Sequence, residues 1–279
     1  MALSLGNRLE DKVMNEREQA YKEYYIYNVE NTSLTAGTGA AFTDTTIRTD
    51  TDADFELIKR THVANDGRIL AQFKDDAYGR NYQNAALDLR TISGGRVSDI
   101  TVGAVNGDAG GFLPFVLPRP IMLKGGTTYT SSLSDFSGVA NSIRLALHGA
   151  KIRSGQAPWN QPWRARPAFD YTTGRSTIAA NGTATFNVAI NIDSHFLIHK
   201  ITAVNTGPAL VTVKDQAVDR QWMNVACHID NFGGNAHFPN ILPAPRFIYK
   251  GSVINITVQD LSAASNVVQI TFHGEKLFL

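Results

Sequence analysis

The chain has one cysteine, Cys227, among 279 residues. No intrachain disulfide can form, so the fold must be held by its core and its hydrogen bonds. A lone cysteine is most often a small, buried apolar side chain, and we predict that role for Cys227.

Long apolar runs are missing as well. No stretch approaches the roughly 20 residues that a membrane-spanning helix needs, so the sequence predicts no membrane contact. The first residues, MALSLGNRLEDK, lack the apolar segment of a signal peptide. These absences predict a protein that is made and folded in a reducing cytoplasm.

The chain has no excess charge of either sign, because 26 Lys and Arg residues oppose 25 Asp and Glu residues. Phosphate neutralisation supplies much of the affinity of nucleic-acid-binding proteins, so this balance argues against direct nucleic-acid binding. Charged residues make up 18% of the chain, below the usual share of about a quarter. Fewer surface charges resist association less, which favours an assembling protein.

Motifs of catalysis and metal binding are also absent from the sequence. It contains no G-x-S-x-G, no H-E-x-x-H and no phosphate-binding loop. His195 and His199 share a face if they lie on a strand, but no third metal ligand is near them. We therefore expect no catalytic residue, no metal site and no cofactor.

What the chain does contain is an internal repeat. Residues 74–85 read KDDAYGRNYQNA, and residues 214–225 read KDQAVDRQWMNV. LPRP (117–120) returns as LPAP, and HGAK (148–151) returns as HGEK (273–276). The offset is constant from 117 to 151, so the chain is two copies of one domain.

The sequence pattern of both copies is typical of β-strands. Short runs rich in Thr, Val, Ile and Phe are separated by Gly, Asn and Pro, and no helical pattern comes between them. This predicts two tandem antiparallel β-sandwiches, jelly-roll-like, with an N-terminal amphipathic helix. The predicted units are a helix or arm (1–31), repeat one (32–151), a Pro/Trp-rich linker (152–175) and repeat two (176–279).

Residues shared by the copies favour a structural interpretation. The two prolines of LPxP predict an extended segment outside a central ladder. Lys74, Asp75 and Arg80 recur and predict a polar network at a turn or interface. Asp76 becomes Gln216 in the second copy, so the carboxylate pair with Asp75 is not retained.

Segments outside the repeat are the candidate contacts with partners. Residues 5–28 have the apolar spacing of an amphipathic helix and show no counterpart in the second copy, so the helix should dock on its own domain, a neighbouring subunit or a partner. The first copy alone has an inserted loop at 96–111, and the linker has two tryptophans that either pin it between the domains or form an aromatic platform. The candidate contact residues are Leu9, Val13, Tyr21, Tyr24, Tyr25, Asp99, Asn106, Asp108, Trp159 and Trp163.

The blocks LPRPIMLKGG, TYTSSLSDFSG and ANSIRLALHGAK resemble a β-sandwich module of structural proteins in tailed-bacteriophage particles. There the module is similar to minor capsid, decoration, collar or connector components. The resemblance covers both copies but not the N-terminal segment, and it implies assembly without catalytic residues. Tandem jelly rolls in one chain also resemble the plan of the major capsid proteins of tailless phages.

Together these features predict a non-enzymatic structural protein of a bacteriophage particle, made in the host cytoplasm and located in the virion. Its expected partners are further copies of itself, as a homo-oligomeric ring or trimer, and other virion proteins. One alternative is a double jelly-roll major capsid protein. A second is a carbohydrate-binding host-recognition module, which exposed Trp159, Trp163 or Trp222 would favour. A third, a glycan-degrading enzyme, would need two facing carboxylates.

Overall fold

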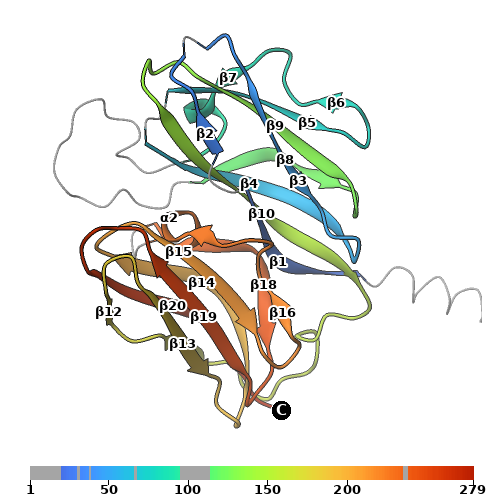
Figure 1. The fold of residues 1–279 in the computed structure, drawn as a ribbon. Coiled ribbons are helices and arrows are strands. Elements are labelled where there is room, and N and C mark those ends of the chain that lie inside the picture. The colour runs from blue at the N-terminus through green and yellow to red at the C-terminus, as the bar shows by residue number, and fades with distance from the viewer. Residues whose placement is uncertain (1–19, 30–31, 38, 66–67, 95–113, 235–237) are drawn as a thin grey trace, which may run out of the picture.

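The computed structural model describes residues 20–29, 32–37, 39–65, 68–94, 114–234 and 238–279. These residues form two similar β-sandwiches, one above the other in Figure 1. Repeat 1 denotes strands β1 to β10, and repeat 2 denotes strands β11 to β20. No described helix is long and apolar enough to cross a membrane.

Repeat 1 consists of two antiparallel sheets of five strands each. The first has the order β1-β10-β4-β8 with β2 also on β10, and its bounds are β1 (Ala20–Asn28), β2 (Thr32–Leu34), β4 (Asp54–Ala64), β8 (Phe115–Leu123) and β10 (Asn141–Ser154). The second has the order β3-β9-β5-β6 with β7 also on β5, and its bounds are β3 (Thr43–Arg48), β5 (Ile69–Asp75), β6 (Arg80–Asn81), β7 (Leu87–Asp88) and β9 (Thr128–Asp135). A short 3₁₀ helix, η1 (Leu89–Thr91), follows β7.

Repeat 2 repeats this plan strand for strand. Its first sheet has the order β11-β20-β14-β18 with β12 on β20, and its bounds are β11 (Ala168–Thr172), β12 (Ser176–Ile178), β14 (His195–Asn205), β18 (Asn240–Ile248) and β20 (Asn266–Leu277). Its second has the order β13-β19-β15-β16 with β17 on β15, and its bounds are β13 (Thr183–Ala189), β15 (Ala209–Asp215), β16 (Arg220–Gln221), β17 (Cys227–His228) and β19 (Val253–Asp260). Helix α2 (Ile229–Phe232) takes the place of η1.

The strand order is that of a jelly roll. In each repeat the first, fourth, eighth and tenth strands make one sheet, while the third, fifth and ninth lie in the other, so the chain alternates between layers. Strand β5 illustrates how the two sheets pack against each other. Ile69, Ala71 and Phe73 are fully buried and alternate with less buried residues, so one face of the strand enters the core.

The predicted duplication is confirmed, because equivalent residues of the two copies lie on equivalent strands. Lys74 and Lys214 occupy the same position, on β5 and β15, and each pairs with the residue after the repeated arginine. His148 and His273 lie on β10 and β20, each beside a register shift. Cys227 is buried, as predicted, in the core of repeat 2.

The LPxP motifs lie on β8 and β18, the edge strands of their sheets. Register is lost between Ile121 and Val116 on β8, and likewise between Arg246 and Ile241 on β18. The prolines fall inside these unpaired stretches, where a missing N–H donor breaks no ladder hydrogen bond. The prediction of an extended segment outside a central ladder is therefore confirmed.

The predicted N-terminal helix is wrong for residues 20–28, which form strand β1; the remainder of the helix prediction, like residues 1–19 as a whole, lies outside the described residues. Strand β1 pairs with β10 along its full length, from Ala20 opposite Ser154 to Asn28 opposite Ala146. Its six residues from Glu23 onward are all buried, because one face enters the core of repeat 1 and the other contacts repeat 2. A strand covered on both faces has no polar side, so its apolar spacing resembled that of a helix.

Strand β1 also has a counterpart in the second copy, contrary to the sequence interpretation. Tyr27 lies opposite Leu147 on β10, and Tyr171 lies opposite Phe272 on β20. Both tyrosine hydroxyls accept a backbone N–H, from Asp50 at 2.8 Å and from Asn191 at 3.0 Å. Strand β11 therefore belongs to the sandwich of repeat 2, although residues 152–175 were predicted as a linker.

Candidate assembly interface

The repeated H-G-x-K motif is a framework element. A Cβ on Gly149 would lie 2.0 Å from the carbonyl oxygen of Glu56, and one on Gly274 would lie 2.0 Å from that of Leu197. Only glycine allows the neighbouring strand to approach this closely. The motif therefore fixes a bulge in each repeat and needs no chemical role.

The lysine that ends the motif clamps the end of the sheet. Lys151 lies 4.1 Å from the ring centre of Tyr25 and donates to Asp50 and Asp52 at 2.6 and 2.9 Å. In repeat 2, Lys276 lies 4.5 Å from the ring centre of Phe169 and contacts Asp193 at 3.2 Å. Equivalent contacts in both copies indicate shared architecture.

The two repeats differ where they touch each other, at a contact surface that we call the junction. The outer edge of β1 is covered by the segment Trp222–Val225 of repeat 2. Ile26 donates its backbone N–H to Trp222 O at 3.0 Å and bridges to Met223. The side chain of Asn224 accepts from Asn28 N at 2.7 Å and donates to Asn28 O at 3.1 Å. Repeat 2 thus adds a short segment to the sheet of repeat 1, as in strand addition between proteins.

Charged side chains meet beside this edge. Glu23 on β1 contacts Arg246 at 3.1 Å, Arg153 at 3.1 Å and Arg220 at 3.5 Å. Arg246 is almost fully buried, lies 5.2 Å from the ring centre of Trp222, and donates to Tyr24 O at 3.2 Å. Burial lowers the pKa of Arg246, while Glu23 opposes that shift. A buried charge without partners would be strongly unfavourable, so these contacts hold the repeats in one relative position.

A series of hydrogen bonds between buried polar side chains also crosses the junction, on the other side of β1. The Tyr24 hydroxyl lies 3.1 Å from His148 Nδ1, and His148 Nε2 lies 2.9 Å from Thr61 Oγ1. Lys59 donates to Asn240 Oδ1 at 2.8 Å and to Ile241 O at 2.6 Å. Burial lowers the pKa of Lys59 to about 7. Burial and the nearby charge of Lys59 also lower the pKa of His148, which favours neutral imidazole.

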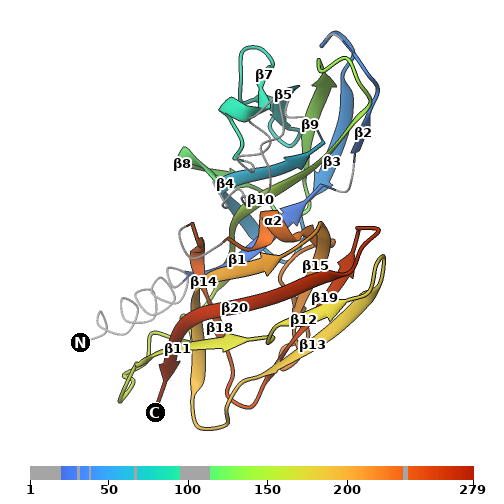
Figure 2. The same ribbon diagram turned by 90° about the vertical axis from the view of Figure 1, so that its left-hand side faces the viewer.

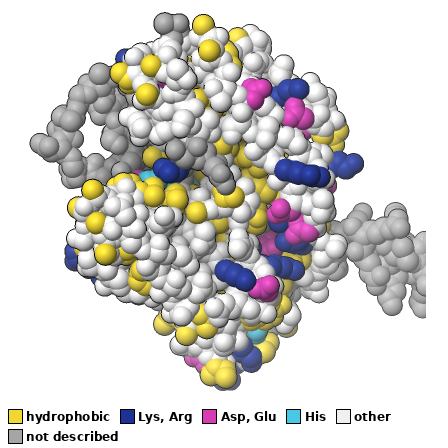
Figure 3. All heavy atoms as spheres, in the orientation of Figure 1, with side chains coloured by type: hydrophobic (Ala, Val, Ile, Leu, Met, Phe, Trp, Pro, Cys, Tyr) yellow, Lys and Arg dark blue, Asp and Glu magenta, His cyan; other side chains and the backbone are white. Residues whose placement is uncertain are grey.

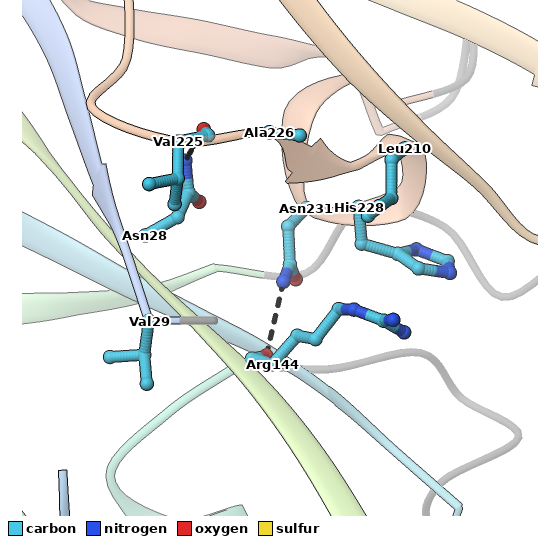
Figure 4. Close-up of a pocket in the computed structure, with 8 residues that line it drawn as sticks. All are labelled: Asn28, Val29, Arg144, Leu210, Val225, Ala226, His228 and Asn231. Atoms are coloured by element: carbon cyan, nitrogen blue, oxygen red, sulfur yellow. Dashed lines mark hydrogen bonds between the residues drawn. The ribbon is translucent and has the colours of Figure 1, made fainter. Parts of the chain in front are cut away.

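A cavity of about 230 Å³ remains at the junction (Figure 4). Asn28, Val29 and Arg144 of repeat 1 face residues from β15, β17 and α2 of repeat 2, and Asn231 donates to Arg144 O at 3.2 Å. Asn28 Nδ2 also donates to Val225 O across the cavity, at 3.2 Å. The space is a gap between the two sandwiches and shows no arrangement of a nucleophile with a base.

Eight of the ten predicted contact residues divide into three groups. Tyr24 and Tyr25 are buried inside the chain, Tyr24 at the junction and Tyr25 in the core of repeat 1. Tyr21 is partly exposed and meets Trp159 edge-to-face with ring centres 5.7 Å apart. Five others lie outside the described residues: Leu9, Val13, Asp99, Asn106 and Asp108.

The linker tryptophans pack against repeat 2. Trp159 and Trp163 cover a small cluster of Leu197, Phe247 and Leu277 on the outer face of its first sheet. Trp163 Nε1 donates to Trp159 O at 3.0 Å. Trp222, the third tryptophan, is fully buried at the junction. The linker is therefore pinned as predicted, mainly on repeat 2, while Trp159 also contacts Tyr21 of repeat 1.

The histidine pair contributes no metal site among the described residues, where no group of three suitable ligands exists. His199 lies 2.9 Å from Glu275, and His195 stacks on Phe247 with ring centres 5.1 Å apart. Figure 3 shows basic and acidic side chains interspersed on the face that it presents. This distribution agrees with the balanced charge of the sequence.

Sequence reasoning missed the junction residues Glu23, Lys59 and Arg246. The available signal was the pattern Tyr-x-Tyr at 25–27 against Phe-x-Tyr at 169–171, which would have placed β1 in the repeat. With β1 in the sheet, its second apolar face would have required a cover.

Comparisons with known proteins give only remote similarity. No protein-family model matches the sequence, and no curated protein matches it. One similar solved structure is described as a triple jelly roll fold and turret assembly in an archaeal virus, with 10% identity and a TM-score of 0.29 over 90% of this chain and 60% of that chain. Another is the major capsid protein P2 from bacteriophage PM2, with 11% identity and a TM-score of 0.25 over 92% of this chain and 98% of that chain.

A third similar structure comes from Sulfolobus Turreted Icosahedral Virus, with 10% identity and a TM-score of 0.27 over 89% of this chain. The match covers 60% of the chain of the Sulfolobus virus protein, and also 60% of the chain of the first archaeal virus protein. TM-scores of this size carry no argument about family or function. The jelly-roll assignment rests on the strand order of this chain itself.

Proposed function

We propose that the protein is a non-enzymatic structural component of a virus particle that acts by binding further copies of itself and other particle proteins. The observation that carries this proposal is the junction. Repeat 2 covers the edge of β1, and Asn28 and Lys59 of repeat 1 make hydrogen bonds to groups of repeat 2 across the contact. Two sandwiches held in this way form one stiff body, which is what a shell or connector is built from.

Residues shared by the repeats support the same role. The glycine bulge, the lysine clamp and the tyrosine hydroxyl bond recur in both sandwiches, and each holds strands together. An active site would instead need a nucleophile, a base and an orienting group in one place. The framework explains the repeated residues without such a site.

Among particle roles we favour a bacteriophage shell subunit built from two jelly rolls over a minor capsid, decoration, collar or connector protein. Both sandwiches are complete, and each has two five-stranded sheets in the same order. Two near-equivalent bodies in one chain let a small number of chains close a ring of pseudo-equivalent domains. The proposed location is therefore the virion, after synthesis in the host cytoplasm.

The carbohydrate-binding alternative lacks the feature that would favour it. Trp222 is fully buried, and Trp159 and Trp163 pack on the linker cluster with Leu197 and Phe247. A flat row of exposed tryptophans is therefore not formed by these three residues.

The mass and symmetry of the purified full chain test the proposal. Light scattering and negative-stain imaging over a range of concentrations should show a closed oligomer of defined size. Contrary results would be a monomer at every concentration, or turnover of a glycan that a single Asp or Glu substitution abolishes without loss of fold.

A further inference from the structure

The junction between the repeats shows how one sandwich of this chain recognises another. Repeat 2 uses its Trp222–Val225 segment, and repeat 1 offers the outer edge of β1. Each repeat also contains the equivalent of the surface that the other repeat uses in the junction. These two equivalent surfaces are not covered within the described part of the chain, and we call them the leftover surfaces. They are the segment Tyr82–Ala85 of repeat 1 and the outer edge of β11, with which no described strand pairs.

We propose that these two leftover surfaces bind each other between chains, so that Tyr82–Ala85 of one copy covers the edge of β11 of a second copy. The contact would repeat the junction and join chains head to tail. This inference rests on the proposed function, because it names the surface through which the subunits assemble.

The asparagine that hydrogen-bonds to the edge of β1 in the junction has an equivalent on the leftover surface of repeat 1. Asn224 binds both backbone groups of Asn28, and its equivalent in repeat 1 is Asn84. Asn84 is exposed and makes no hydrogen bond to the described residues. The equivalent of Asn28 is Thr172, at the exposed end of β11. An amide side chain at this point is therefore available to a strand edge from another chain.

A pocket of about 290 Å³ marks the same surface on repeat 1. It is lined by Arg80, Tyr82 and Met122, among others, and their equivalents in repeat 2 are Arg220, Trp222 and Phe247. In repeat 2, Arg220 contacts Glu23 of β1, and the Trp222 ring lies against Arg246, which itself donates to Tyr24 O. The pocket is the open form of a site that is filled in the other repeat.

Residues on the two leftover surfaces have changed together. The ion pair Glu23–Arg246 of the junction corresponds to Pro167 and Ile121, so a charged pair is replaced by an apolar pair. The hydrogen-bonded pair Tyr24–Asn240 corresponds to Ala168 and Phe115, which again are both apolar. If a leftover surface contacted a junction surface instead, a polar side chain such as Glu23 or Asn240 would be buried against an apolar one. Each surface is therefore matched to its own partner.

The face around β11 is also open where the contact requires it. Trp159 and Trp163 cover Leu197 and Leu277, whose repeat 1 equivalents, Glu56 and Ile152, lie away from the junction. The equivalents of the junction residues Ile26, Lys59 and Ala146 are Asp170, Lys200 and Thr271. All three are exposed or partly exposed, and Asp170 and Thr271 are more polar than their equivalents, as suits a surface that is in water before assembly.

Cysteine pairs test this contact directly on the full chain. Ile26 and Met223 are bridge partners within the chain, and such partners fall in the roughly 4.4–6.8 Å Cα range that a disulfide spans. The equivalent pair, Gln83→Cys with Asp170→Cys, should form disulfides between chains on mild oxidation, seen as multimers on non-reducing gels. Ile26→Cys with Met223→Cys is the matched control, and it should form its disulfide within one chain.

A charge substitution gives a second measurement that does not depend on disulfide geometry. Asn84→Asp removes the donor and should raise the dissociation constant of self-association about tenfold or more in sedimentation experiments. Asn187→Asp is the control, since it adds the same charge on the exposed face of β13 and can still accept from Asn255. It should leave the constant unchanged.

The outcomes separate this inference from the proposed function. Oligomers that form normally in Asn84→Asp, with no interchain disulfide in the Gln83 and Asp170 variant, would overturn the surface and leave the structural role standing. A wild-type chain that never self-associates would overturn both. Interchain disulfides together with weakened Asn84→Asp assembly would support the surface.

Discussion

The outer faces of the two equivalent sheets differ in what covers them. In repeat 1 the face of β1, β4 and β10 is covered by repeat 2, and Tyr24, Lys59 and His148 are buried there. In repeat 2 the corresponding face shows Ala168, Lys200 and a partly exposed His273. The inward faces are apolar in both repeats, whereas the outward faces keep the lysine and the histidine but differ in how far these side chains are buried. Duplication therefore preserved the sandwich and adjusted the surface around it.

Replacing the equivalent aromatic residues Trp222 and Tyr82 by alanine should give the largest difference in stability between the covered surface and the open one. Trp222→Ala empties a fully buried site at the junction and should lower the free energy of unfolding by about 3–5 kcal/mol. Tyr82→Ala, at the half-buried equivalent, should lower it by about 1 kcal/mol. Denaturant unfolding of both variants measures the difference. Equal losses would show that the junction is no better packed than the open surface.

The glycine bulges should respond alike in the two repeats. A methyl group at Gly149 or Gly274 meets a backbone carbonyl 2.0 Å away. We expect Gly149→Ala and Gly274→Ala each to destabilise its sandwich by about 3 kcal/mol. Thermal unfolding followed by circular dichroism tests this. A tolerated substitution in only one repeat would show that the two frameworks are not equivalent.

The two equivalent lysines should differ in their effect on pH dependence. Folding lowers the pKa of Lys59 to about 7, so the unfolded chain binds more protons above that pH and stability should rise as the pH increases. Over about two pH units above 7 this group should contribute on the order of 2 kcal/mol. Unfolding measured across this range should show a shallower rise in Lys59→Met.

Lys200→Met is the matched control, because Lys200 is exposed at the equivalent position on β14. It should keep the slope of the wild-type chain. A Lys59→Met variant with that same slope would mean that Lys59 titrates as an ordinary lysine.

The tyrosine hydroxyls should give the smallest and most similar effects. Tyr27→Phe leaves Asp50 N without its acceptor, and Tyr171→Phe does the same to Asn191 N. Each change should lower the free energy of unfolding by about 1 kcal/mol. Denaturant titration of the two variants should give nearly equal losses. A loss in one repeat only would place the hydroxyl bond outside the shared framework.

The sequence was sufficient for the duplication, the antiparallel sandwiches and the burial of Cys227. Those features depend on alternation and on motifs that recur at a constant offset, which are local properties of the chain. It was not sufficient for β1, because apolar residues on both faces imitate a helical stripe.

The junction could not be predicted for a physical reason. Glu23 and Arg246 are 223 positions apart, and only the relative placement of two folded sandwiches brings them within 3.1 Å. Asn224 and Asn84 are the same residue type at equivalent positions, yet of the two only Asn224 has hydrogen-bond partners among the described residues. The difference lies in three-dimensional neighbours that no local pattern records.

The position of β1 has a consequence for the order of folding. This strand leaves the ribosome before its sheet neighbour β10, and the Trp222–Val225 segment that covers its outer edge is made later still. Until then the nascent chain has an uncovered, tyrosine-rich edge that can pair with another chain. Such distant pairing also slows folding. The outer edge of the first sandwich is therefore covered only when about half of the second has been synthesised, and a chain interrupted between them should aggregate.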